Sequence, residues 1–318
     1  MKNTKAFLPI LMTAIIVMTT CLATHIQHLM RPTLTLFIHG SRPQLHSAFY
    51  KIGQYYFLPD MHHVNEQMPY AGPRAIIDGL NDSGYIDMQH LYFFGWSGRI
   101  SAKERLKTAT EQLVPQLEQL VATYRSTYGS TPAMRIITHS HGGNVALNML
   151  HALEQKMSDI IIDELIILAA PVQSWTKEYI KSNNCKKIYS LFSADDWIQV
   201  VDPQGLQVHI NKDQVKDKPA WFELSKRTFE HHDTLTQARI IINNRDPEHV
   251  AFIDVLYPKQ LRYLLPHQFP RFLPELGTIM QKIKHADIQK HISSTQQPVC
   301  IRIDTRKQDA DERIQVSI

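Results

Sequence analysis

The chain is expected to fold as an α/β protein with a mostly parallel central sheet and helices on both faces. Short apolar runs rich in β-branched residues alternate along the sequence with longer segments in which apolar residues recur every three or four positions. Such alternation of buried strands and amphipathic helices is typical of a parallel sheet covered on both sides. With 318 residues, 43% of them hydrophobic, the chain is long enough for one large domain.

The elements follow one another in a regular order. Helical periodicity covers residues 102–128, resumes directly after Gly142-Gly143, and returns near 174–182 and up to about 265. Segments 44–90 and 203–236 have an irregular or polar, loop-like composition. We expect a polar C-terminal tail at 286–318, with possible edge strands at 299–303 and 314–318. The predicted core strands are 33–38, 91–96, 134–137, 165–168, 188–192 and 239–243.

The N-terminus has the pattern of a secretory signal or a signal anchor. Lys2 and Lys5 precede an apolar run at residues 6–23, and Cys21-Leu22-Ala23 resembles a cleavage site. We therefore expect residues 1–24 to be a signal peptide or membrane anchor, with the lysines in the cytoplasm and the folded domain on the non-cytoplasmic side. A buried core helix is the alternative for this run. The main folded domain is then expected at 30–285.

Charge and cysteine content exclude several classes of protein. The net charge is only +4, and no basic run with interleaved aromatic residues is present, so we expect no nucleic-acid partner. The cysteines at 21, 185 and 300 are far apart, which argues against a structural zinc site. Cys185 and Cys300 are expected either to form one disulfide or to remain two free thiols.

Ser140 is the candidate nucleophile. It lies in Thr138-His139-Ser140-His141-Gly142-Gly143, between a predicted strand and a predicted helix. A sharp strand-to-helix turn exposes the serine oxygen and needs small residues two positions on either side. Gly142 provides the downstream small residue, whereas Thr138 departs from the pattern upstream. An ordinary turn serine is the alternative.

The end of the first strand is the candidate oxyanion loop. His39-Gly40-Ser41 follows the run 33–38, and in this architecture the loop after that strand donates one N–H to the developing oxyanion. The expected donors are the backbone N–H groups of His141 and of Ser41 or Gly40.

An acid and a base are expected at later strand ends, since reactive groups gather at the carboxyl ends of parallel strands. Asp195 and Asp196 both follow strand 188–192. We favour Asp196 as the acid and keep Asp195 as the alternative. His249 follows the last core strand and is the candidate base, which gives the chain order Ser, Asp, His.

His139 and His141 together form a weak alternative metal pair, because no carboxylate lies near them in sequence. We therefore expect no metal and no cofactor.

Taken together, these motifs resemble the α/β-hydrolase superfamily over about residues 33–280. The segment Phe94-Gly95-Trp96-Ser97-Gly98 before a long helix and the serine turn looks like its lipase or serine-esterase branch. The resemblance implies an eight-stranded, mostly parallel sheet and ester or thioester hydrolysis without a cofactor.

The expected substrate is a carboxylic ester, with a lipid or acyl ester favoured. Segments 44–73 and 203–236 are candidate lid or substrate loops, with Pro203, Trp221, Phe222 and Phe229 as apolar contacts, or else plain surface insertions. Acyl transfer by the same triad and a catalytically silent binding protein are the alternative functions.

Overall fold

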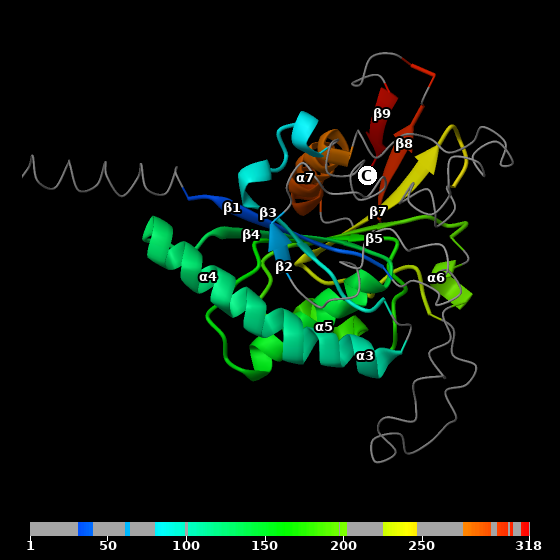
Figure 1. Ribbon diagram of the computed structural model, residues 1–318. Coiled ribbons are helices and arrows are strands. Elements are labelled where there is room, and N and C mark those ends of the chain that lie inside the picture. Colours follow the sequence, from blue (N-terminus) through cyan, green and yellow to red (C-terminus); the bar gives the residue numbers. More distant parts are fainter. Residues whose placement is uncertain are drawn as a thin grey trace, which may run out of the picture.

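A nine-stranded sheet forms the centre of the molecule in the computed structural model (Figure 1), with strand order β2-β3-β1-β4-β5-β6-β7-β8-β9. The seven strands from β3 to β8 in this order are mutually parallel, and only the two edge strands β2 and β9 are antiparallel. The structure describes residues 31–40, 61–63, 80–98, 101–196, 198–201, 225–246, 276–293, 298–304, 306–307 and 313–317.

The inner strands are apolar along most of their length because both faces of the sheet are covered. In β1 five of the six residues are buried, and in β6 all five are. The strand bounds are β1 Thr33–Ile38, β2 Met61–His63, β3 Leu91–Phe94, β4 Ala133–His139, β5 Glu164–Leu168, β6 Ile188–Phe192, β7 Leu235–Ile242, β8 Val299–Ile303 and β9 Ile314–Ser317.

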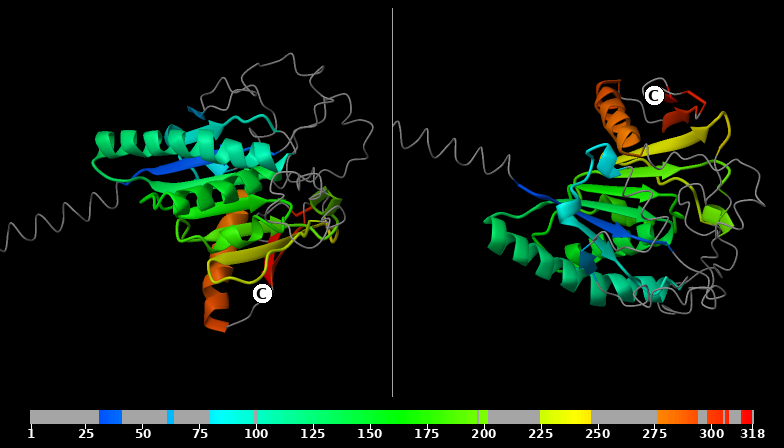
Figure 2. Two further views of the ribbon diagram at one scale, coloured as in Figure 1. Left: turned by 90° about the horizontal axis from the view of Figure 1, so that it is seen from below. Right: turned by 45° about the horizontal axis from the view of Figure 1, so that its top comes forward.

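Helices cover the two faces separately (Figures 1 and 2). On one face lie α3 (Ala102–Lys107), α4 (Val114–Tyr128) and α5 (His141–Gln155), and on the other lies α7 (Leu276–Ser293). The structure also has the short helices η3 (Met88–His90), η5 (Lys177–Lys181) and α6 (Ile198–Val201). The predicted α/β class, with a mostly parallel sheet between two helical layers, is confirmed.

A π-helical segment, η4 (Thr108–Leu113), joins α3 to α4 within one continuous helix. Pro115 follows it at the start of α4. A proline inside a helix lacks an N–H and its ring collides with the carbonyl four residues earlier. The wider π turn relieves that collision, and Ala109 and Leu113 of the segment remain fully buried.

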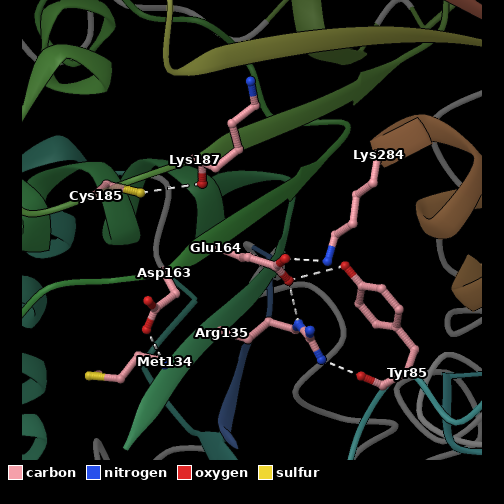
Figure 3. Close-up of polar contacts among 8 residues, drawn as sticks. All are labelled: Tyr85, Met134, Arg135, Asp163, Glu164, Cys185, Lys187 and Lys284. Atoms are coloured by element: carbon pink, nitrogen blue, oxygen red, sulfur yellow. Dashed lines mark hydrogen bonds and ion pairs between the residues drawn. The ribbon is translucent and has the colours of Figure 1, made fainter. Parts of the chain in front are cut away.

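A charged cluster ties α7 to the amino-terminal end of the sheet (Figure 3). Glu164 accepts hydrogen bonds from Lys284 of α7, from Nε of Arg135 at 2.7 Å and from the hydroxyl of Tyr85 at 3.2 Å. Arg135 and Lys284 also lie over the Tyr85 ring. Burial alone would raise the pKa of Glu164. The positive charges and hydrogen bonds of Arg135 and Lys284 outweigh the effect of burial and hold this pKa below its usual value. Burial raises the pKa of Tyr85.

The expected boundary at residue 285 and the polar tail at 286–318 are wrong, whereas the strands expected at 299–303 and 314–318 are confirmed as β8 and β9. Residue 285 lies inside α7, and β8 and β9 extend the sheet beyond β7. Tail side chains such as Ile301 and Ile314 are buried in the core. The sheet accordingly has nine strands rather than the eight that the resemblance implies.

The structure decides two further expectations, on the role of Phe229 and on the state of the cysteines. Phe229 is buried in the core, so it is not a lid residue. Cys185 and Cys300 are both free thiols, and burial raises the pKa of Cys185, whose Sγ lies 3.4 Å from the Lys187 carbonyl (Figure 3), to about 12. None of the described helices is long and apolar enough to cross a membrane. The expected leader at 1–24, the expected helix up to 265, Pro203, Trp221 and Phe222 lie outside the described residues.

Candidate active site

Ser140 occupies the sharp strand-to-helix turn that the sequence predicts. It follows β4 directly and precedes His141, the first residue of α5, with backbone angles φ 50° and ψ −130°. A non-glycine residue at positive φ costs about 1–3 kcal/mol and persists only where its surroundings enforce it. Two hydrogen bonds hold it here: its N–H donates to the Leu168 carbonyl at 2.8 Å, and its carbonyl accepts from Gly143 at 2.9 Å.

The two glycines after Ser140 are required by space rather than by backbone angle. A Cβ atom on residue 142 would lie 2.4 Å from the Ile38 carbonyl oxygen and 2.6 Å from that of His39. A Cβ on residue 143 would lie 2.7 Å from the Cβ of Ala170. The absence of side chains at these positions lets α5 start directly against the ends of β1 and β5.

Thr138 fits the turn even though the sequence pattern favours glycine there. Its side chain is fully buried, and its hydroxyl donates to the Ile166 carbonyl of β5 at 3.2 Å. A Cβ at position 143 would lie 3.4 Å from the Thr138 Oγ1, an ordinary van der Waals contact, so the threonine does not itself require glycine there. The threonine is accommodated because its hydroxyl is satisfied within the sheet.

The candidate oxyanion loop lies against the serine. A Cβ on Gly40 would lie 2.8 Å from the Cβ of Ser140, because β1 and β4 are paired in parallel with Ile38 opposite Thr138. Trp96 fixes this loop: its indole N–H donates to the His39 carbonyl at 2.8 Å, and its ring stacks on the His39 imidazole at 5.5 Å.

His141 begins α5, so its backbone lies at the positive end of the helix dipole. Asn144, fully buried one turn later, lies with its amide nitrogen 3.5 Å from the His141 Nδ1 and donates to the Pro171 carbonyl at 3.0 Å. Its amide oxygen accepts from the Thr176 hydroxyl at 2.7 Å. This buried network fixes the first turn of the helix from behind.

The two aspartates after β6 have different surroundings. Asp196 is fully buried, and its Oδ1 accepts from the Gln199 N–H at 3.1 Å at the start of α6. Its backbone carbonyl also accepts from Arg227 Nε at 3.1 Å. Asp195 is exposed. A buried, oriented carboxylate suits the role of the triad acid, so burial favours Asp196 over Asp195.

Asp246 is a further residue at this end of the sheet, which the sequence motifs alone do not indicate. Its Oδ1 accepts from the Ala194 N–H at 3.0 Å, so it joins the β7 end to the loop that carries Asp196. Arg239 of β7 binds both of its carboxylate oxygens, at 2.9 and 2.6 Å. This arginine holds the pKa of Asp246 below its usual value. A polar turn, Asn243-Asn244, before an aspartate was the available signal.

The structure thus brings Ser140, His141 and Gly40 together and places Asp195 and Asp196 after β6, two strands away from β4 in the sheet. Ser41 and the candidate base His249 lie outside the described residues. Within the described part of the chain, no three histidine, cysteine, aspartate or glutamate side chains are grouped as metal ligands.

Comparison with known proteins gives only distant likenesses. No protein-family model matches the chain, and no curated protein matches it. Phospholipase PlaB from Legionella pneumophila is similar over 52% of this chain and 40% of its own, with TM-score 0.28 and 11% identity. The complex of PlaB with thio-NAD is similar over 51% of this chain and 38% of its own, with TM-score 0.29 and 11% identity. This chain therefore spans less than half of the length of PlaB.

A lipase-esterase related protein from Clostridium acetobutylicum is similar over 68% of this chain and 76% of its own, with TM-score 0.24 and 11% identity. Likenesses at this level add nothing to what the chain's own residues show. The fold and the candidate site therefore rest on the topology and contacts described above.

Proposed function

We propose that the protein is a serine hydrolase that cleaves a carboxylic ester through an acyl-enzyme. The observation that carries the proposal is the backbone of Ser140, held at φ 50° between β4 and α5 with the His39-Gly40 loop against it. Glycine would relieve this strain, yet a serine stands here at the end of a parallel strand, where reactive groups gather. Its retention is explained by a nucleophile whose oxygen must face substrate.

The proposed reaction uses three side chains. His249 takes the proton of the Ser140 hydroxyl as its oxygen attacks the ester carbonyl carbon, and Asp196 orients the imidazole. His249 then gives the proton to the leaving alcohol as the carbon–oxygen bond breaks. Water, deprotonated by the same histidine, hydrolyses the acyl-enzyme and restores Ser140.

The negative oxygen of each tetrahedral intermediate is stabilised by backbone N–H groups of His141 and of Gly40 or Ser41 in this proposal. The closeness of Gly40 to Ser140 and the start of α5 at His141 support it. Donors fixed in advance stabilise the developing charge without reorganisation, and one such donor contributes about 100- to 1000-fold in turnover.

Lipid or long-chain acyl esters are the proposed substrate class. The apolar run at residues 6–23 would hold the catalytic domain at a membrane, on its non-cytoplasmic side. The apolar residues Trp221 and Phe222 in segment 203–236 suit long acyl chains.

Hydrolysis of p-nitrophenyl esters of increasing acyl length tests the proposal. The wild type is expected to release p-nitrophenol and to prefer longer chains, whereas Ser140→Ala is expected to lose turnover while keeping its fold. Product analysis with and without an added alcohol separates hydrolysis from acyl transfer. No turnover of any ester by folded wild-type protein would contradict the proposal and favour a silent binding protein.

A further inference from the structure

The proposed triad requires the loops after β6 and β7 to keep a fixed position relative to each other. Asp196 follows β6 and His249 follows β7, and these strands are parallel neighbours with Phe192 opposite Arg239. An acid orients a base only through a hydrogen bond of fixed length and angle. The relative position of the two strand-end loops is therefore part of the chemistry.

One carboxylate connects these loops. Asp246 accepts the Ala194 N–H at 3.0 Å and binds Arg239 through both oxygens, at 2.9 and 2.6 Å. The Asp246 side chain is 14% exposed, and the lowered pKa keeps it ionised. Bidentate arginine–carboxylate pairs fix orientation as well as distance. We call Arg239, Asp246 and the Ala194 N–H the clasp.

A tight turn brings Asp246 back to the strand that it follows. Asn243 and Asn244 have φ of 49° and 64°, and Ile242 and Arg245 exchange backbone hydrogen bonds of 2.7 and 2.9 Å. Two residues at positive φ between such a pair form the turn type that asparagine favours. The turn reverses the chain, so that Asp246 contacts Arg239 of β7 itself and Ala194 in the loop that follows the neighbouring strand β6.

In sequence, one clasp residue lies within three positions of the proposed acid, Asp196, and another within three positions of the proposed base, His249. Ala194 is two residues before Asp196, and Asp246 is three residues before His249. Three residues span at most about 11 Å of extended chain, so the clasp limits where the base can lie. Asp196 is separately held by Gln199 and Arg227. The acid is thus fixed by its own contacts, and the start of the base segment is fixed by Asp246.

We propose that Asp246 is a positioning residue, which with Arg239 anchors the segment carrying His249 against the loop carrying Asp196. This inference rests on the proposed function. Asp246 has no direct role toward substrate or Ser140; it acts by keeping the base within reach of its acid. Displacement of a catalytic group by about 1 Å can cost roughly 100-fold in rate, so loss of the clasp should act on turnover more than on substrate binding.

Steady-state kinetics of Asp246→Ala, Asp246→Asn and Arg239→Lys test the clasp, with melting temperatures measured alongside. Asp246→Ala is expected to lower kcat by about 10- to 100-fold with KM within about twofold of wild type. Asp246→Asn keeps an acceptor for Ala194, and Arg239→Lys keeps a charge for Asp246. Both are expected to lose less, about 3- to 10-fold in kcat, because part of the clasp remains.

Glu164→Ala is the matched control. It also removes a carboxylate from a partly buried arginine pair, but at the opposite, amino-terminal end of the sheet. It is expected to lower the melting temperature while leaving kcat within about twofold of wild type, because it does not touch the strand-end loops. A fall in kcat as large as that of Asp246→Ala would show that general destabilisation explains both, and would overturn the inference.

The remaining outcomes are also decisive. A folded Asp246→Ala protein with kcat within twofold of wild type overturns the clasp while leaving the proposed function intact. If Asp246→Ala does not fold, Arg239→Lys decides: unchanged kcat overturns the inference, and a reduced kcat with unchanged KM supports it. No turnover by the wild type overturns the proposed function and, with it, this inference.

Discussion

The carbonyl oxygen of Ile38 lies 2.4 Å from the position that a Cβ atom on Gly142 would occupy. This approach presses the end of β1 against the first turn of α5, directly beside Ser140. The oxyanion loop and the serine turn are therefore one packed unit, in which a single methyl group has no room.

Gly142→Ala is accordingly expected to lower both stability and activity. Overpacking of this kind costs about 1–3 kcal/mol, and a shifted first turn of α5 should lower kcat by about 100-fold. Chemical denaturation and ester turnover measure the two effects. Gly84→Ala is the control: its Cβ would meet nothing within 4 Å, and its φ of 66° makes it strained but remote from the site. Equal kcat values for the two variants would contradict the packing argument.

Ser140→Gly is expected to be more stable than Ser140→Ala, although both lack the hydroxyl. Only glycine relieves the strain at φ 50°, and the gain exceeds its larger entropy in the unfolded chain by about 1 kcal/mol. Free energies of unfolding from denaturant titration compare the two variants. If alanine proved as stable as glycine, the turn would not be strained.

The elements nearest the site were the most predictable from sequence. β1 and β6 have the bounds that their apolar runs predict, because strands buried on both faces are continuously hydrophobic. The turn at Ser140 was predictable because a buried strand runs into two glycines. Both features indicate that the start of the following helix packs closely against neighbouring backbone. Asp196 was favoured from sequence, but its burial was not visible there.

The two C-terminal strands were predictable from sequence, but their burial in the core was not, for a physical reason. β8 and β9 have five and four residues and alternate apolar with polar side chains, which resembles a polar tail. Their burial depends on α7, whose Leu276, Ile279, Met280 and Ile283 have helical spacing that was available in the sequence. The clasp was not predictable, because Asp246 reaches Arg239 only through the turn at Asn243-Asn244, and the sequence does not fix the geometry of that turn.

Asp196→Asn is expected to impair turnover far more than Asp195→Asn. Loss of the carboxylate that orients a catalytic histidine lowers kcat by roughly 10⁴-fold, because the imidazole then takes the wrong tautomer. Asp195 is exposed, so its substitution should leave kcat within about twofold. Steady-state kinetics on the two single variants decides, and a larger loss in Asp195→Asn would reverse the assignment.

Glu164→Gln is expected to destabilise the protein in a pH-dependent way. The pKa of Glu164 is lowered on folding, so its contribution is present above the unfolded pKa of about 4.3 and is lost as pH falls through the folded value. The difference in melting temperature between wild type and variant should thus be largest near neutral pH and shrink below about pH 4.

Asp304→Asn is the control for that titration, because Asp304 also binds an arginine, Arg306, but at the surface. Exposed pairs contribute little, so its melting temperature should stay close to that of wild type. A difference for Glu164→Gln that stays constant from pH 7 to pH 3 would contradict a role for the ionised carboxylate.

Covalent labelling by a fluorophosphonate, read by intact mass and peptide mapping, tests the nucleophile most directly. The wild type is expected to gain one phosphonyl group on the peptide that contains Ser140, and folded Ser140→Ala to gain none. Labelling that persists in Ser140→Ala, or no labelling of the folded wild type, would contradict the account.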